Sequence, residues 1–143
     1  MTSEIKKKIP VKKTILVVED EAPLQDAIKL KLQRERFRYL PATTAEEALT
    51  ILEKEKPDLI WLDLLMPGMG GFAFLEKIRQ NPAYRDLPVV IVSVSASPEK
   101  IRRAFELNVF DYLVKSHYKL DDIIKRIRGF IVKSPSGQSY ERN

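Results

Sequence analysis

Cysteine is absent from this chain of 143 residues, and histidine occurs once. Without thiols the protein has no disulfide, no thiolate metal site and no cysteine nucleophile. The sequence also lacks an apolar run near the ~20 residues that a membrane helix requires. Its basic N-terminus, MTSEIKKKIPVKK, is followed by an apolar stretch too short for a secretory signal peptide. We therefore expect a protein of the cytoplasm without a membrane span.

The charged residues are unevenly distributed along the chain. The net charge is +5, and residues 1–13 contribute +4 of it through five lysines and Glu4. Residues 14–132 hold 18 basic and 18 acidic side chains and are therefore neutral. A DNA-binding domain more often carries a basic face on its own fold, so we expect no direct contact with nucleic acid. We predict a basic disordered tail over residues 1–12, one folded domain over 13–132 and a polar tail over 133–143.

Short apolar runs alternate with amphipathic segments, which is the pattern of a parallel sheet with crossover helices. The runs TILVVE and VVIV are apolar on both faces of a strand, as expected for buried strands. We predict a doubly wound, flavodoxin-like α/β domain with five parallel strands, in the order 2-1-3-4-5, and five helices. Pro41 lies in the second strand, which therefore belongs at a sheet edge. The predicted strands are residues 14–19, 38–43, 58–63, 88–93 and 110–114.

Each predicted strand is followed by a helix. Pro23 suits the first turn of the first helix, and Thr44 opens the second through a Thr-Ala-Glu-Glu capping box. Ser97 and Pro98 open the fourth as a cap and first turn. The apolar stripe of the first helix consists of Leu24, Ile28, Leu30 and Leu32. The predicted helices are residues 22–35, 44–54, a segment with apolar residues from 72 to 78, residues 98–107 and 120–132.

Five polar side chains stand at the ends of four predicted strands. They are Glu19 and Asp20 on the first strand, Asp63 on the third, Ser93 on the fourth and Lys115 on the fifth. Binding sites of doubly wound domains lie beyond the carboxyl ends of the strands, so we expect these side chains on one rim. Single acids at strand ends often only cap a helix or face solvent. Three together predict a magnesium site, because the cation removes their mutual repulsion.

Four motifs carry a family resemblance: ILVVEDE, DLLMPGMGG, PVVIVS and DYLVK. In this order and spacing they resemble the receiver domain of two-component response regulators, over about residues 13–132. The resemblance implies that Asp63 accepts a phosphoryl group from a histidine kinase or a phosphotransfer protein. It also implies a signalling phospho-acceptor rather than an enzyme, since such a domain promotes only its own phosphotransfer and dephosphorylation.

The resemblance further implies a metal site around Asp63. Asp20, Asp63 and the backbone carbonyl of Leu65 would ligate Mg²⁺, and Glu19 would contact the ion directly or through water. The acidic pair is Glu-Asp where Asp-Asp is commoner in the family, which lengthens one arm of this site. The Leu65 side chain cannot position an attacking water, so we predict a long-lived aspartyl phosphate.

The implied phosphoryl-binding groups come from the last two strands. Ser93 would bind one phosphoryl oxygen, Lys115 would pair with another, and Tyr112 would either change rotamer as a switch or simply pack in the core. Ser95 has the same strand parity as Ser93, but alignment to the strand end favours Ser93. A cis-proline usually follows the family's lysine, whereas this chain has Ser116. A cis bond before a non-proline costs ~3–4 kcal/mol, so we predict a trans bond.

The expected output is contact with other proteins. The chain ends soon after its last predicted helix, so we expect it to act alone on a downstream protein target, to relay the phosphoryl group, or to form a homodimer. The expected dimer face comprises the fourth helix, the fifth strand and the fifth helix. Its charged residues are Arg102, Arg103, Glu106, Asp111, Asp121, Asp122 and Lys125.

Three alternatives stay open. An unphosphorylated receiver would serve as an interaction module, although the intact acidic trio and Lys115 argue against it. A flavodoxin-like nucleotide or flavin binder would need a glycine-rich loop after the first strand, where this chain has EDEAPLQ. A hydrolase acting through Asp63 would need a second acid two residues later, and Leu65 stands there.

Overall fold

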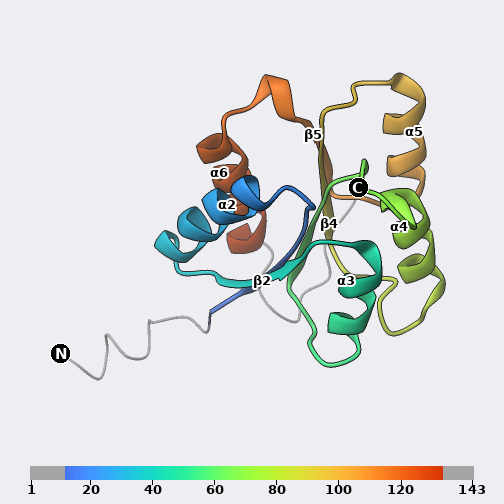
Figure 1. Ribbon diagram of the computed structural model, residues 1–143, viewed down its shortest axis with the longest axis horizontal. Helices are drawn as coiled ribbons and strands as arrows, with labels where there is room; N and C mark the ends of the chain where they lie inside the picture. Colours follow the sequence, from blue (N-terminus) through green and yellow to red (C-terminus); the bar gives the residue numbers. More distant parts are fainter. Residues whose placement is uncertain (1–11, 134–143) are drawn as a thin grey trace.

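A computed structural model describes residues 12–133 as a parallel sheet between two layers of helices (Figure 1). The strand order is β2-β1-β3-β4-β5, and all neighbouring strands are parallel. The predicted fold is therefore confirmed, with the Pro41 strand at an edge, where proline breaks no inner ladder. The strands are β1 (Thr14–Val18), β2 (Arg38–Ala42), β3 (Leu59–Leu62), β4 (Val89–Ser93) and β5 (Asp111–Val114).

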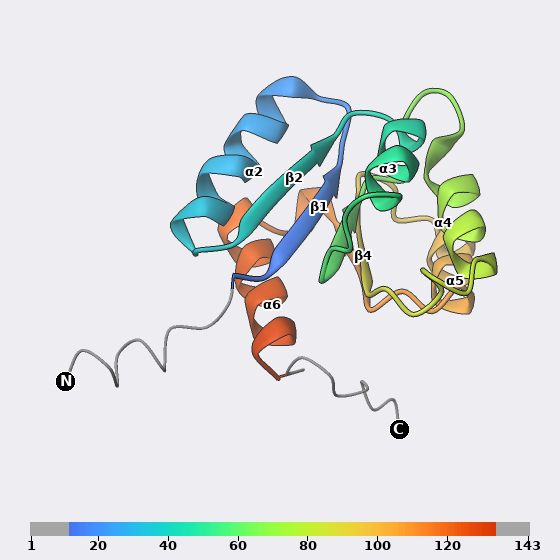
Figure 2. The ribbon, with the colours of Figure 1, turned by 90° about the horizontal axis from the view of Figure 1, so that it is seen from below.

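The helices cover both faces of the sheet (Figures 1 and 2). The helices are α2 (Ala22–Arg34), α3 (Ala45–Leu52), α4 (Gly70–Gln80), α5 (Pro98–Glu106) and α6 (Leu120–Lys133), with a short 3₁₀ turn, η1 (Lys115–His117), after β5. Helices α2 and α6 lie on one side of the sheet, and α3, α4 and α5 lie on the other. Successive strand residues point to opposite faces. Val17 and Trp61 therefore pack with the apolar residues of α2 and α6, whereas Val18 and Leu62 pack with those of α3 and α4.

The helix starts follow the predicted caps. The Thr44 side chain accepts a hydrogen bond from the Glu47 N–H at 3.0 Å. Glu47 Oε1 accepts from the Thr43 N–H at 2.7 Å, one residue further back than in a standard capping box. The Ser97 side chain accepts from the Lys100 N–H at 3.4 Å. Both predicted caps are confirmed, although α3 ends two residues before its predicted boundary.

The inward face of α2 differs from the predicted stripe. Gln25, Ile28 and Leu32 are buried, whereas Leu30 is 61% exposed. Leu30 is two positions beyond Ile28, and two residues turn a helix by about 200°, so both cannot face the sheet. The assignment of Leu30 to the stripe was therefore wrong, and the polar Gln25 lies on the sheet side instead.

Strands β1, β2 and β3 each end one residue before the predicted boundary. At β1 the reason is local, because the Glu19 N–H still donates to the Ala42 carbonyl at 2.9 Å, but the Glu19 carbonyl accepts from the Gln25 side chain at 3.0 Å. Apart from residues 12 and 133, the predicted tails lie outside the described residues. Within the described range, none of the helices combines the length and apolarity that a membrane crossing requires.

Candidate functional site

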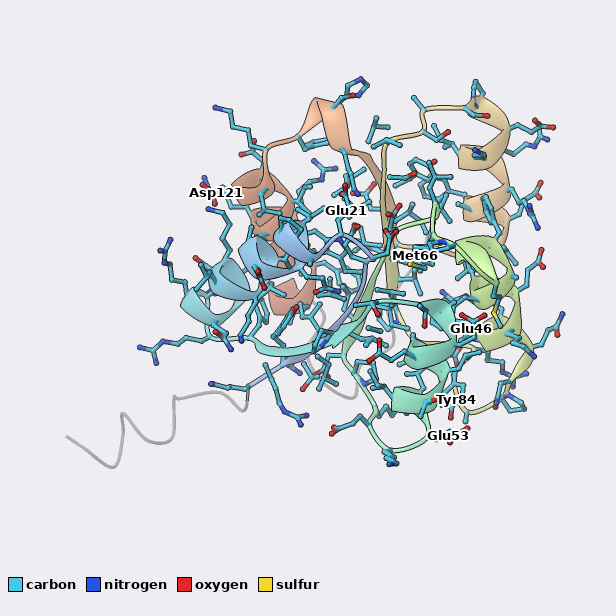
Figure 3. The ribbon with its side chains drawn as sticks, viewed as in Figure 1. Glu21, Glu46, Glu53, Met66, Tyr84 and Asp121 are labelled. Atoms are coloured by element: carbon cyan, nitrogen blue, oxygen red, sulfur yellow. The ribbon has the colours of Figure 1, made fainter. Side chains whose placement is uncertain are left out.

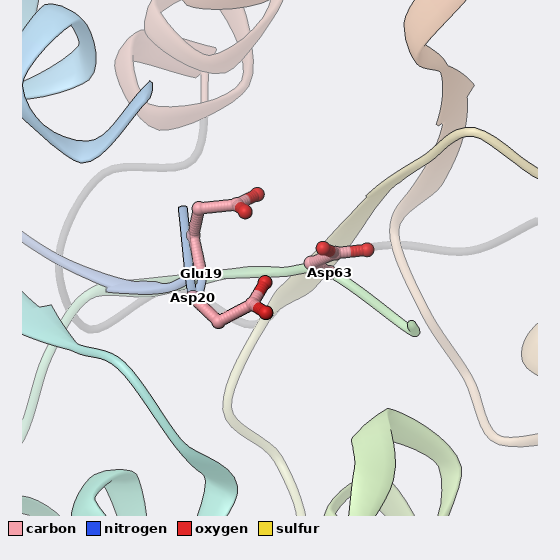
Figure 4. A group of neighbouring side chains, drawn as sticks. All are labelled: Glu19, Asp20 and Asp63. Carbon is pink, nitrogen blue, oxygen red and sulfur yellow. The ribbon is translucent and has the colours of Figure 1, made fainter. Parts of the chain in front are cut away.

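The three predicted carboxylates meet at the carboxyl edge of the sheet (Figure 4). The β1–β3 register pairs Val18 with Leu62, so Glu19 and Asp63 emerge side by side. One carboxylate oxygen from each of Glu19, Asp20 and Asp63 lies within 4.8 Å of the other two. The Asp63 N–H donates to the Val18 carbonyl at 3.0 Å and ties this backbone to β1. We call this group of three carboxylates the acidic pocket.

The three carboxylates differ in burial. Glu19 is 0% exposed and Asp63 4%, whereas Asp20 is exposed. Burial raises the pKa of Asp63, and the Asp20 charge adds to the rise, while the Leu65 N–H, 3.1 Å from Oδ1, opposes it. Burial also raises the pKa of Glu19, and the Asp63 charge contributes. Two of the three carboxylates are therefore costly to ionise in this pocket.

Lys115 reaches the acidic pocket from the start of η1. Its Nζ lies 3.0 Å from Glu19 Oε1 and 3.6 Å from Asp63 Oδ2. Burial lowers the pKa of Lys115, but the hydrogen bond to Glu19 and the charges of Asp63 and Glu19 outweigh it, so this pKa is raised. Residues 12–133 contain no cis peptide bond, so Lys115–Ser116 is trans, as predicted. One lysine against three carboxylates leaves the pocket acidic.

Ser93 and Tyr112 come from the two strands at the far side of the sheet. Ser93 is the last residue of β4 and is completely buried, and its Oγ accepts from the Ser95 N–H at 3.3 Å. Ser95 is half-buried, and its Oγ accepts from the Ser97 N–H at 3.3 Å. The Tyr112 hydroxyl donates to the Ser95 carbonyl at 3.0 Å, and burial raises the pKa of Tyr112. Tyr112 therefore ties the loop after β4 to β5.

Glycines shape the segment between Asp63 and α4. Gly68 follows Pro67 and has a φ of +77°, a left-handed conformation that glycine adopts without steric cost. A Cβ placed on Gly71 would lie 2.6 Å from the Leu64 Cα and 2.8 Å from the Asp63 carbonyl oxygen. The first turn of α4 therefore packs directly on the backbone of Asp63, at a distance that only glycine allows.

Two polar residues near the site were not identified from the sequence. Glu46 of α3 accepts a hydrogen bond from the Met69 N–H at 3.2 Å and holds the loop before α4 (Figure 3). Gln25 of α2 is buried and donates to backbone carbonyls at the end of β1. Glu46 gave no signal beyond its place in the capping box. For Gln25 the available signal was a polar residue three positions before Ile28, at helical spacing.

The donor set of the acidic pocket suits a hard divalent cation. All three side-chain donors are carboxylate oxygens, the ligand type that Mg²⁺ prefers. The cation would also offset the carboxylate repulsion that contributes to the raised pKa values of Glu19 and Asp63. The residues present therefore fit Mg²⁺ in ligand type and charge.

Known proteins share both the fold and the motifs around this pocket. The pattern that defines the response regulator receiver domain matches residues 15–128, and the chain belongs to this family. The phosphate regulon transcriptional regulatory protein PhoB of Escherichia coli is 32% identical over 114 residues, which are 80% of this chain and 49% of PhoB. The structure of the chemotaxis protein CheY4 of Vibrio cholerae has a TM-score of 0.78 at 25% identity and covers 85% of this chain and 100% of CheY4. A CheY-like receiver domain protein from Methanospirillum hungatei has a TM-score of 0.79 at 26% identity, covering 86% and 96%.

Family membership defines the class of protein. The described fold is a receiver domain of two-component response regulators, which is a signalling domain, and receiver domains generally bind Mg²⁺ at an acidic pocket. The chain spans about half the length of the first curated relatives that it matches.

Proposed function

We propose that Asp63 accepts a phosphoryl group from the phosphohistidine of a sensor kinase or a phosphotransfer protein. The observation that carries this proposal is the buried Asp63 carboxylate at the strand ends, with two further carboxylates within 4.8 Å and Lys115 Nζ at 3.6 Å. In the transfer, an Asp63 oxygen bonds to phosphorus while the P–N bond to the donor imidazole breaks. The bonding electrons stay on the imidazole nitrogen, and Asp63 becomes an aspartyl phosphate.

Lys115 and Ser93 are proposed to bind the transferred group. Phosphoryl transfer asks a protein mainly for positioning and for neutralisation of charge. Lys115 pairs with one phosphoryl oxygen, because its ammonium group already lies close to the Asp63 carboxylate. Ser93 donates its hydroxyl hydrogen to another oxygen, because Ser93 Oγ only accepts in its bond with Ser95. Ser93 is the last residue of β4 and is completely buried, whereas Ser95 lies in the loop beyond the strand end, which supports the assignment to Ser93.

Mg²⁺ is proposed to be held by Asp20, Asp63 and the Leu65 backbone carbonyl, with Glu19 in direct or water-mediated contact. When bound, the cation supplies positive charge that stabilises the charge on the phosphoryl oxygens. Asp20 is the exposed member of the pocket and therefore the carboxylate most open to an incoming ion. Glu19 is already paired with Lys115 at 3.0 Å, and it therefore links the metal-binding and phosphoryl-binding halves of the pocket.

Tyr112 is proposed to report phosphorylation to the rest of the domain. Its hydroxyl holds the Ser95 carbonyl, two residues after Ser93. A displacement of Ser93 toward the phosphoryl group would therefore change the hydrogen bond that holds Tyr112. This coupling supports a switch role for Tyr112 rather than simple core packing.

The surface formed by α5, β5 and α6 is the proposed contact face for a downstream protein or a second copy. Most of its charged residues already pair within the chain. Arg103 pairs with Glu76 at 2.6 Å and Asp111 with Arg126 at 3.1 Å. Arg102 pairs with Glu106 at 3.9 Å, and Asp121 with Lys31 at 2.5 Å. Symmetric salt bridges across a dimer would have to replace such pairs. Exposed pairs contribute only about 0–1 kcal/mol each, so this face supports a protein partner more strongly than a dimer held by charge alone.

The test of the proposed function is phosphorylation by acetyl phosphate in the presence of Mg²⁺. We expect intact mass spectrometry to find one added phosphoryl group on the wild type and on Asp86→Asn, an exposed aspartate in the α4–β4 loop. Asp63→Asn should show none. An unmodified wild type would contradict the proposal and favour an unphosphorylated interaction module.

A further inference from the structure

Gln25 is buried behind the acidic pair of β1. It is 5% exposed and lies on the sheet side of α2, one turn before Ile28. Three backbone carbonyls surround its Nε2, those of Val17 at 3.0 Å, Glu19 at 3.0 Å and Ala42 at 3.1 Å, and they share its two N–H hydrogens. Carbonyl oxygens only accept hydrogen bonds, so the nitrogen of the side-chain amide must face them. The orientation of the Gln25 amide is therefore determined by its surroundings.

The oxygen of the same amide is also engaged. The Tyr39 hydroxyl on the edge strand β2 donates to Gln25 Oε1. Burial raises the pKa of Tyr39, and the Asp26 charge adds to the rise, so the hydroxyl keeps its proton and can donate. An apolar residue in place of Gln25 would leave buried carbonyls and a hydroxyl without this partner, which is costly in a protein interior.

Two of the three carbonyls, those of Val17 and Glu19, lie near the end of β1, and the third, that of Ala42, lies at the end of the neighbouring strand β2. The Ala42 carbonyl also accepts a hydrogen bond from the Glu19 N–H at 2.9 Å, so Gln25 contacts both Glu19 and the residue of β2 to which Glu19 is bonded. Beyond Val18 the β1 ladder has ended. The Glu19 carbonyl therefore bonds to the Gln25 side chain instead of to a neighbouring strand. The next residue is Asp20, and both Glu19 and Asp20 direct their carboxylates toward Asp63 (Figure 4).

We propose that Gln25 is a positioning residue for metal binding, which holds the Glu19–Asp20 backbone so that both carboxylates face Asp63. The inference rests on the proposed function of the acidic pocket as a Mg²⁺ and phosphoryl site. Groups that orient metal ligands from behind typically contribute 10–100-fold to metal affinity. Gln25 touches neither the ion nor the phosphoryl group in this account, and it acts through the peptide of the acidic pair.

The experiment compares Gln25→Met with Ile28→Val. The first variant keeps the side-chain length and removes the hydrogen bonds. The second loses a methylene group on the same buried face of α2, one turn further on, without a bond to the acidic pair. We expect calorimetric titration with Mg²⁺ to give a Kd about tenfold higher for Gln25→Met and an unchanged Kd for Ile28→Val. The Mg²⁺ concentration for half-maximal phosphorylation by acetyl phosphate should rise in parallel, while the rate at saturating Mg²⁺ stays near that of the wild type.

A metal-free measurement separates this inference from the proposed function. In EDTA, hydrogen exchange of the Glu19 amide should accelerate in Gln25→Met but not in Ile28→Val. Tyr39→Phe removes the hydroxyl that donates to Gln25 Oε1 and, at 3.4 Å, to the Gln25 carbonyl, and it leaves the Gln25 Nε2 contacts in place. This variant serves if Gln25→Met does not fold, with an expected loss of about two- to threefold in Mg²⁺ affinity. An unchanged Kd in the variant that folds overturns the positioning role. A wild type that binds no Mg²⁺ contradicts the proposed function. In that case the exchange rate of the Glu19 amide still tests Gln25, and an unchanged rate in Gln25→Met overturns its positioning role.

Discussion

Asp63→Asn should make the metal-free protein more stable, although it removes the residue on which the proposed function depends. The Asp63 carboxylate is nearly fully buried, and burial raises its pKa. Asparagine has nearly the same shape, and its Oδ1 can still accept the Leu65 N–H that now bonds to Asp63 at 3.1 Å. The substitution therefore removes a buried charge while preserving the main hydrogen bond.

The distances in the pocket give the size of the effect. At an effective dielectric constant of about 20, two unit charges 4.8 Å apart interact by about 3.5 kcal/mol, and two at 3.6 Å by about 4.6 kcal/mol. Glu19 and Asp20 each repel the Asp63 carboxylate by at least about 3.5 kcal/mol, and Lys115 attracts it by about 4.6 kcal/mol. The net repulsion is about 2 kcal/mol, and solvent around the exposed Asp20 reduces it. We expect Asp63→Asn to raise the free energy of unfolding by about 1–2 kcal/mol, or Tm by about 3–6 °C.

The assay is thermal and urea unfolding at pH 7.5 in EDTA, repeated with Mg²⁺. A raised pKa in the folded state means that ionised Asp63 destabilises the fold above that pKa. This cost shrinks as the pH falls through the folded-state pKa and vanishes below the unfolded value near 3.9, so the gap between variant and wild type should narrow on acidification. Mg²⁺ at tenfold its Kd should stabilise the wild type by about 1.4 kcal/mol and the variant much less. An Asp63→Asn protein that is less stable than the wild type in EDTA would refute this electrostatic reasoning.

Three further predictions concern the backbone and the lifetime of the phosphoprotein. Gly71→Ala should lower the free energy of unfolding by about 1–3 kcal/mol, because its Cβ would lie within 2.8 Å of backbone atoms of Leu64 and Asp63. Gly129→Ala in α6, which has open space at the Cβ, should raise the free energy of unfolding by up to about 1 kcal/mol. Equal effects of the two substitutions in urea unfolding would contradict this. Arg36 has a φ of +70° just after α2, a conformation that favours glycine, so Arg36→Gly should raise the free energy of unfolding by about 0.5–1 kcal/mol. A variant less stable than the wild type in chemical denaturation would contradict this. Because Leu65 is apolar, the aspartyl phosphate should be long-lived, and Leu65→Gln should shorten the half-life of the ³²P label on purified phosphoprotein; rapid loss from the wild type would count against the assignment.

The sheet and its rim were predictable because burial and topology both leave a direct trace in the sequence. Strands buried on both faces give uninterrupted apolar runs, and the first polar residue after such a run stands at the strand end. Glu19 and Asp63 were found in this way, and the register of Val18 with Leu62 brings them together. The roles of these side chains in phosphoryl transfer stay predictions.

Contacts that depend on the detailed backbone path were not predictable. Hydrophobic periodicity assigned Leu30 to the core of α2, whereas the structure buries Gln25, because carbonyls at the end of β1 need a donor there. The contact of Glu46 with the Met69 N–H joins residues 23 positions apart, and no local pattern marks it. The pairing of Lys115 with Glu19, rather than with Asp63 alone, follows from the turn η1, which no local pattern predicted.

Chemical trapping can show directly whether Asp63 carries the phosphoryl group. Borohydride reduces an aspartyl phosphate to homoserine, which marks the modified position in a peptide mass spectrum. After incubation with acetyl phosphate and Mg²⁺, we expect homoserine at position 63 alone, with none in EDTA. Homoserine at position 20, or unmodified peptides over both positions in a folded protein, would contradict it.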